Sequence, residues 1–249
     1  MPGVGDILSA GTKVTLDNAG LLLGLWAACG LPPQILAFVV GLNTGITDGP
    51  SVKAAFEAGN WGALGMLGAV ACVGLVFGLV GYAATLALAA RSLRGQESAV
   101  GGLLSQALGR LIAVVVASVL TGMAVGFGFV LLFLPGLYLM VRLSLAVGAT
   151  VVEDAGPLDA ISRSWNLTSG RFGETLTFLA ALILAAFGAF LAVIAAGLVL
   201  RLVASVAGAP GRLFAGLAIN ALQFLISAWA AACVTKYLLE LAARQAKTA

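Results

Sequence analysis

The chain has 249 residues, of which 61% are hydrophobic and 9% are charged, and its formal net charge is +3. Charged residues make up roughly a quarter of a typical soluble domain, so this composition excludes that class. Together with a mean hydropathy of +1.10, it predicts an all-α, polytopic membrane protein that forms a single integral membrane domain over residues 1–249.

Several classes of chemistry are disfavoured by what the sequence lacks. There is no histidine, which is a frequent general base and the commonest metal ligand. The three cysteines, Cys29, Cys72 and Cys233, lie singly in apolar runs, where cysteine usually packs as a small hydrophobic residue. Basic residues are scattered and form no stripe that could follow a nucleic-acid backbone. We therefore expect no enzymatic activity, no metal or other cofactor, and no nucleic-acid partner.

Six apolar segments approach or exceed the length of about 20 helical residues that crosses the hydrocarbon core. Pro32 and Pro33 should kink the first segment, because proline removes a backbone hydrogen bond from a helix interior. The fourth segment is the shortest and barely spans. The predicted spans are residues 19–42, 61–90, 111–134, 137–152, 175–204 and 213–239.

Small residues recur at short spacings within the spans. Examples are Gly74, Gly78 and Gly81 in the second segment, and Gly122 and Gly126 in the third. Such spacings let helix backbones approach closely in lipid. We expect ordinary packing of the bundle at these glycines, with a dedicated oligomer interface as the alternative.

The distribution of basic residues predicts the orientation of the chain. Six crossings place both termini on one side, and the loops on that side carry most of the lysines and arginines, which favours a cytoplasmic location. We therefore expect a multi-pass protein with both termini in the cytoplasm. The basic residues on the terminal side are Lys13, Arg91, Arg94, Arg110, Arg163, Arg171, Lys236, Arg244 and Lys247, against Lys53, Arg201 and Arg212 on the other side.

Charge is concentrated in the stretch "EDAGPLDAISRSWNLTSGRF", residues 153–172. Pro157 suits the first turn of a helix and Gly170 suits its C-terminal end. Asp159 and Arg163 are four residues apart, where they can pair. The helix is too short and polar to span, so we expect it to lie at the cytoplasmic surface.

One face of this surface helix is expected to be largely apolar. Leu158, Ile161, Trp165 and Thr168 follow one another at helical spacing. We expect this face to turn toward lipid or toward the bundle, with Trp165 at headgroup level.

Two other stretches resemble this one in position and pattern. "GVGDILSAGTKV" precedes the first span and "AVGGLLSQALGR" precedes the third. Aligned on Ser9, Ser105 and Ser162, each has an apolar residue just before the serine and leads into a pair of spans. The sequence thus predicts three cytoplasmic interfacial amphipathic helices and a possible threefold repeat of interfacial helix plus transmembrane hairpin.

The central region also resembles a known pattern. The stretch "LPGLYLMVRLSLAVGATVVEDAGPLDAISRSWNLTSGRF" is similar to the membrane domain found beside some bacterial glycerophosphodiester phosphodiesterases and in related stand-alone six-span proteins. Outside about 45 residues, only the six-span layout agrees. The resembling positions are Pro135, Gly136, Arg142, Glu153, Ala160, Arg163, Ser164, Trp165, Leu167, Thr168, Gly170 and Arg171.

That resemblance implies a membrane domain and says nothing of chemistry. Relatives that carry the phosphodiesterase have a separate soluble catalytic barrel, for which this chain, ending at Ala249, leaves no room. The enzymatic activity is therefore not expected here. The resemblance does imply a place in the bacterial inner membrane.

Arg142 is the charged residue most in need of explanation, because it lies inside the short fourth span, where a charge is costly. It could anchor a lipid phosphate or another anion. The alternative, which the sequence favours, is a structural clamp on backbone carbonyls or on a carboxylate such as Glu174.

A polar seam runs along the sixth span. Asn220, Gln223 and Ser227 follow at spacings of three and four. Hydrogen bonding between helices is the expected role, and a polar lining for a permeation path is the alternative.

The leading hypothesis is a non-catalytic membrane protein that organises lipid or a partner protein at the cytoplasmic face. The expected contacts to lipid or partner are Arg142, Arg163, Trp165 and Arg171. Membrane phospholipid is the expected ligand, and a protein partner, which would make this an accessory subunit, or a homo-oligomer is the further possibility. The alternative function is a small-solute transporter or channel that uses the polar seam.

Overall fold

The computed structural model describes residues 3–46, 49–206 and 208–248, and over these residues it is helical and without strands. Six helical segments are long and apolar enough to cross a membrane, which confirms the predicted all-α fold. Each predicted span overlaps one of them. The predicted third span, 111–134, runs past Leu131 into the following helix, the sixth helix continues to Lys247 beyond the predicted residue 239, and the other ends differ by at most four residues. The observed segments are Ala19–Thr44, Trp61–Leu93, Leu111–Leu131, Phe133–Val152, Phe172–Leu202 and Leu213–Lys247.

Two of the six spans are interrupted. The first consists of α2 (Ala19–Cys29) and α3 (Leu31–Thr44), and the interruption lies just before the two prolines that predicted a kink. The fourth consists of α8 (Phe133–Leu143) and α9 (Ala146–Val152). The other spans are the continuous helices α5 (Trp61–Leu93), α7 (Leu111–Leu131), α11 (Phe172–Val206) and α12 (Gly208–Thr248).

Short helices form at the three places where the sequence predicts interfacial helices. These are α1 (Val4–Asp17), α6 (Val100–Gly109) and α10 (Pro157–Thr168), and each precedes a pair of spans. A further short helix, α4 (Gly49–Glu57), lies between the first two spans. The order of short helix, span and span thus occurs three times along the chain.

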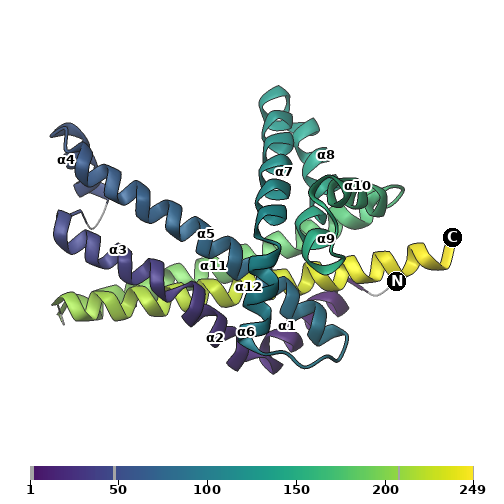
Figure 1. The fold of residues 1–249 in the computed structure, drawn as a ribbon, viewed down its shortest axis with the longest axis horizontal. Helices are drawn as coiled ribbons and strands as arrows, with labels where there is room; N and C mark the ends of the chain where they lie inside the picture. The colour runs from purple at the N-terminus through teal and green to yellow at the C-terminus, as the bar shows by residue number, and fades with distance from the viewer. Residues whose placement is uncertain (1–2, 47–48, 207, 249) are drawn as a thin grey trace.

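The spans do not form one parallel bundle. In Figure 1, α3, α5, α11 and α12 extend toward one end of the molecule, while the α7–α8 hairpin projects steeply away from them. The helices α1, α6, α9 and α10 gather near the region where these groups meet. α1 packs on α12 so closely that a Cβ added to Gly11 would lie 3.4 Å from the backbone nitrogen of Cys233.

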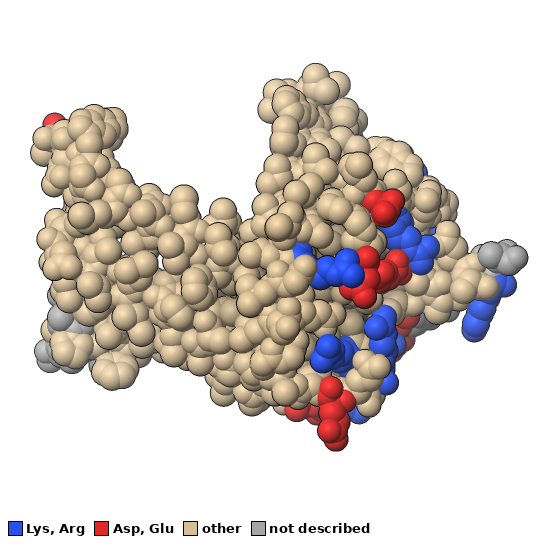
Figure 2. All heavy atoms as spheres, viewed as in Figure 1, with Lys and Arg blue, Asp and Glu red and all other residues tan. Residues whose placement is uncertain are grey.

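Charged side chains gather around this meeting region, which we call the charged end. Figure 2 shows blue and red atoms concentrated there, while the α7–α8 hairpin and the visible arms of the other spans are almost free of charge. Beneath it the spans are tightly packed, and the last turns of α5 are buried from Ala83 to Ala90. The short helices therefore lie near a well-packed part of the core.

The glycines that make close helix contacts are only partly those that the spacing predicted. A Cβ added at Gly122 or Gly126 would meet nothing within 4 Å among the described residues. Close approach occurs instead at Gly128, where an added Cβ would lie 2.8 Å from the Cα of Gly136 across the α7–α8 hairpin. Gly81, which the spacing did predict, is another close position, where an added Cβ would lie 3.2 Å from the Phe224 ring.

Candidate functional site

The interruption of the fourth span is bridged by a side chain from α10. The buried hydroxyl of Ser164 donates to the carbonyl oxygen of Arg142 at 2.7 Å and accepts from the backbone nitrogen of Leu145 at 3.2 Å. Both backbone groups lie at the α8–α9 break, where they would otherwise lack helical partners. One hydroxyl thus satisfies both of them and fixes α10 against the span.

This docking places the side chain of Arg142 among neutral groups. Its Nε donates to the hydroxyl of Tyr138 at 3.0 Å, and its Nη1 donates to Oγ of Ser169 at 3.1 Å. The guanidinium carbon lies 5.1 Å from the Tyr138 ring centroid and 5.0 Å from that of Trp165. Both distances suit a cation–π interaction. Arg142, Tyr138, Trp165 and Ser169 together are called the arginine cage.

The cage contains no carboxylate. None of the ion pairs among the described residues includes Arg142. Glu174, which the sequence offered as a partner, lies instead 3.4 Å from Nη1 of Arg244. Glu174, the carboxylate that the sequence offered as an example of a clamp, therefore does not bind Arg142, and among the described residues no other acid pairs with it.

Arg171 lies at the same corner of the molecule. The next residue, Phe172, stacks on Tyr138 with ring centroids 5.5 Å apart. Gly170 takes a left-handed conformation, with φ of 73°, and turns the chain between α10 and α11. The side chain of Arg171 is half-buried and has no hydrogen-bonding or ionic partner among the described residues. A second cation without an ionic partner among the described residues thus follows Ser169 of the cage by two positions in the chain.

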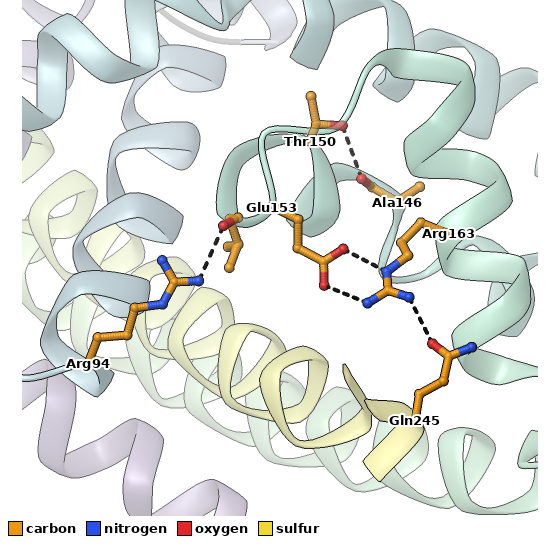
Figure 3. A network of polar contacts seen from close by, with 7 residues as sticks. Arg94, Ala146, Thr150, Glu153, Arg163 and Gln245 are labelled. Atoms are coloured by element: carbon orange, nitrogen blue, oxygen red, sulfur yellow. Dashed lines mark hydrogen bonds and ion pairs between the residues drawn. The ribbon is translucent and has the colours of Figure 1, made fainter. Parts of the chain in front are cut away.

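Arg163 has a different environment. It binds Glu153, with 2.7 Å from Nε to Oε2, and it donates from Nη1 to Oε1 of Gln245 at 2.8 Å. Figure 3 shows Arg163 between these two residues. The hydrogen bond that Arg163 donates to Glu153 raises the pKa of the guanidinium above its ordinary value. The predicted pair of Asp159 and Arg163 is therefore wrong, because Glu153 takes its place.

The face of α10 that packs inward is not the apolar face that the sequence allowed to turn either toward lipid or toward the bundle. Its buried residues are Ala160, Ser164, Leu167 and Thr168. Leu158 is 69% exposed and Trp165 is 37% exposed, so these two side chains face outward. Of the expected face, only Thr168 turns fully into the bundle.

Sequence reasoning missed two members of the arginine cage. Tyr138 lies four residues before Arg142 on the same helix, a spacing at which helical side chains meet, so it could have been found. Ser169 could not, because it reaches Arg142 only through the docking of α10.

The polar seam lines a cavity of about 490 Å³ between α3, α5 and α12. Asn220 Oδ1 accepts a hydrogen bond of 2.8 Å from Nε1 of Trp26 in α2. Gln223 and Ser227 also line the cavity, and Gln34 joins them from α3. The sequence predicted the seam on α12 but not its partners Trp26 and Gln34.

Within the described ranges, no group of three or more cysteine and acidic side chains is placed to hold a metal ion. Six apolar spans with short helices at one end define a polytopic α-helical membrane protein. Comparisons of the chain with protein-family models, curated proteins and solved structures give no match. The resemblance to the phosphodiesterase-associated membrane domain therefore stays a prediction.

Proposed function

We propose that this is a non-catalytic membrane protein that organises anionic lipid at the cytoplasmic face of the bacterial inner membrane. Both chain termini are then cytoplasmic, and the charged end lies at the headgroup region. The observation that carries the proposal is Arg142, a cation at the α8–α9 break inside the fourth span. Among the described residues, its side-chain partners are neutral groups.

The arginine cage has the chemistry expected of a lipid phosphate site. Arginine binds phosphate through parallel N–H donors, and two of the donors of Arg142 are fixed by Tyr138 and Ser169 so that its orientation is set. Tyrosine and tryptophan concentrate at the membrane interface. Arg171, two residues after Ser169 in the chain, adds positive charge at the start of α11.

The four predicted contact residues therefore divide into two groups. Arg142, Trp165 and Arg171 are available to a headgroup, whereas Arg163 is held by Glu153 and Gln245. Arg163 supports the proposal indirectly, because it attaches the surface helix α10 to α12.

Lipid retention tests this proposal. Wild-type protein, Arg142→Gln and the control Arg110→Gln are placed in nanodiscs that contain phosphatidylglycerol and phosphatidylcholine, and the bound lipid is measured by native mass spectrometry. Arg110 is the matched control because its charge is paired with Asp154 at 2.7 Å. One basic residue near the surface contributes about 1 kcal/mol to anionic lipid binding. We expect Arg142→Gln to bind phosphatidylglycerol about fivefold more weakly, with Arg110→Gln unchanged.

Two outcomes would contradict the proposal. Equal losses in the two variants would show that lipid follows net charge rather than the arginine cage. A second protein bound in fixed stoichiometry in the mass spectrum, together with no retained phosphatidylglycerol, would instead make this chain an accessory subunit of that partner.

The alternative of a through-channel finds little support in this conformation. The cavity along the polar seam ends near Tyr82 and Ser227. Toward the charged end, the next residues of α5 and α12 are buried and mostly apolar, and the hydroxyl of buried Thr85 donates to the carbonyl oxygen of Tyr82. The buried apolar residues are Ala83, Ala84, Leu86, Ala87, Ala228, Ala231 and Ala232.

A further inference from the structure

The cavity along the polar seam lies at mid-span. Its lining on α5 extends from Val70 to Tyr82, around the middle of a helix that runs from Trp61 to Leu93. On the first span it is bounded by the interruption at Gly30 and by Pro33 and Gln34. A membrane-buried cavity at an interrupted helix is a recurrent place for binding sites, because the interruption frees backbone groups.

The cavity is largely apolar and carries a few polar groups, none of them charged. No lysine, arginine, aspartate or glutamate lines it. The carboxamide groups of Gln34 and Gln223 have no hydrogen-bond partner among the described residues. Unpaired amide groups at this depth are costly, so a bound molecule that pairs with them is favoured.

The hydrogen bond from Trp26 determines what Asn220 offers to such a molecule. An indole N–H can only donate, so the side-chain oxygen of Asn220 must face Trp26 at the observed 2.8 Å. The amide nitrogen of Asn220 then keeps its two N–H groups for other partners. Asn220 is thereby fixed as a donor, and its preferred ligand atom is an oxygen acceptor.

The cavity is also accessible from the side of the bundle. Gly78, Gln223 and Ser227 are exposed although they line it. The remaining wall includes the rings of Phe77 and Phe224, which offer apolar and aromatic surface. A ligand can thus enter from the hydrocarbon and need not cross the packed layer near the charged end.

We propose that this cavity binds an uncharged, lipid-soluble molecule with carbonyl oxygens, of the quinone class. Amide donors from Gln34, Asn220 and Gln223 bind the carbonyl oxygens, and Phe77 and Phe224 contact the ring. The absence of charged lining selects against ionised headgroups, and the mid-span depth selects against the ester carbonyls of phospholipids, which lie near the interface. The site is separate from the arginine cage and does not depend on it.

Binding of decylubiquinone to the purified full-length protein in nanodiscs tests the proposal. Asn220→Leu and Gln34→Leu remove amide donors, and we expect each to weaken binding about tenfold. Gln106→Leu is the matched control, because Gln106 is a carboxamide on α6 outside the cavity. Arg142→Gln should bind decylubiquinone as the wild type does.

A second variant tests the cavity without removing a polar group. A Cβ added at Gly78 meets nothing within 4 Å among the described residues, so Gly78→Leu fills the cavity with little strain. Gly68→Leu, at an equally open position on α5 outside the cavity, is its control. We expect Gly78→Leu to abolish binding and Gly68→Leu to leave it unchanged.

Three results would overturn the proposal. The first is no saturable binding of decylubiquinone to the wild type. The second is binding that survives both Gly78→Leu and Asn220→Leu. The third is equal affinity for decylbenzene, which has the same chain and a ring but no carbonyl oxygens, because the amide groups would then contribute nothing.

Discussion

The guanidinium of Arg163 binds both carboxylate oxygens of Glu153, at 2.7 Å from Nε to Oε2 and 3.2 Å from Nη2 to Oε1. This two-point pair connects the end of α9 to α10, and Gln245 extends it to α12. Since Arg94 in addition donates to the carbonyl oxygen of Val152, four helices meet around the end of the fourth span (Figure 3).

Breaking this pair should lower stability. Glu153→Gln weakens a charge-assisted, two-point interaction that is only partly exposed, and we expect a cost of about 1 kcal/mol after allowance for solvent screening. The midpoint of thermal unfolding in detergent should fall. Lys53→Ala, which breaks the highly exposed pair with Glu57, is the control and should leave the midpoint unchanged. Equal midpoints for the two variants would show that the Glu153 pair adds no stability.

Ser164→Ala should destabilise the protein more strongly. The hydroxyl serves the carbonyl of Arg142 and the N–H of Leu145 at the α8–α9 break, and its removal leaves both groups without that partner. An unpaired buried polar group costs about 1–3 kcal/mol. Ser162→Ala, at an exposed position of the same helix, is the matched control in the same thermal measurement. A midpoint for Ser164→Ala no lower than that of Ser162→Ala contradicts the assigned role of the hydroxyl.

The α7–α8 hairpin should be sensitive to one glycine and tolerant at another. Gly128→Val places a Cβ 2.8 Å from the Cα of Gly136, which forces the two helices apart, and overpacking of this kind typically costs about 1–3 kcal/mol. Gly126→Val meets nothing within 4 Å among the described residues and should be tolerated. Both variants are compared by their yield and by the midpoint of thermal unfolding in detergent. A larger drop in yield or midpoint for Gly126→Val than for Gly128→Val would contradict this packing.

The orientation in the membrane can be tested by cysteine labelling. In a background without native cysteines, Glu57→Cys places a thiol at the end of α4, and Gln96→Cys places one between α5 and α6 at the charged end. An impermeant maleimide added to spheroplasts should label Glu57→Cys and should reach Gln96→Cys only after lysis. Labelling of both positions before lysis would reject a cytoplasmic charged end.

The candidate sites were predictable only in part. Arg142 was recognisable from sequence because a charge inside an apolar span needs an explanation, and Tyr138 lay within one helical turn of it. The partner of Arg163 was not recognisable, because Asp159 has the favourable spacing along the helix whereas Glu153 is brought close by the turn before α10. Spacing along the sequence predicts which side chains meet within one helix. It does not predict contacts between residues that come together only when separate helices pack.

The amino-acid composition by itself determined the class, and the order of residues along the chain determined the six spans and the positions of the short helices. These properties follow from hydrophobic segment length and from local turn and capping residues, which act over a few helical turns. Tertiary structure alone decided that Ser164 bridges the α8–α9 break, that Trp26 orients Asn220 and that Arg142 lies among neutral groups. Each of these contacts joins residues from different helices, and hydrogen-bond geometry depends on distances of a few tenths of an ångström that only the packed helices set.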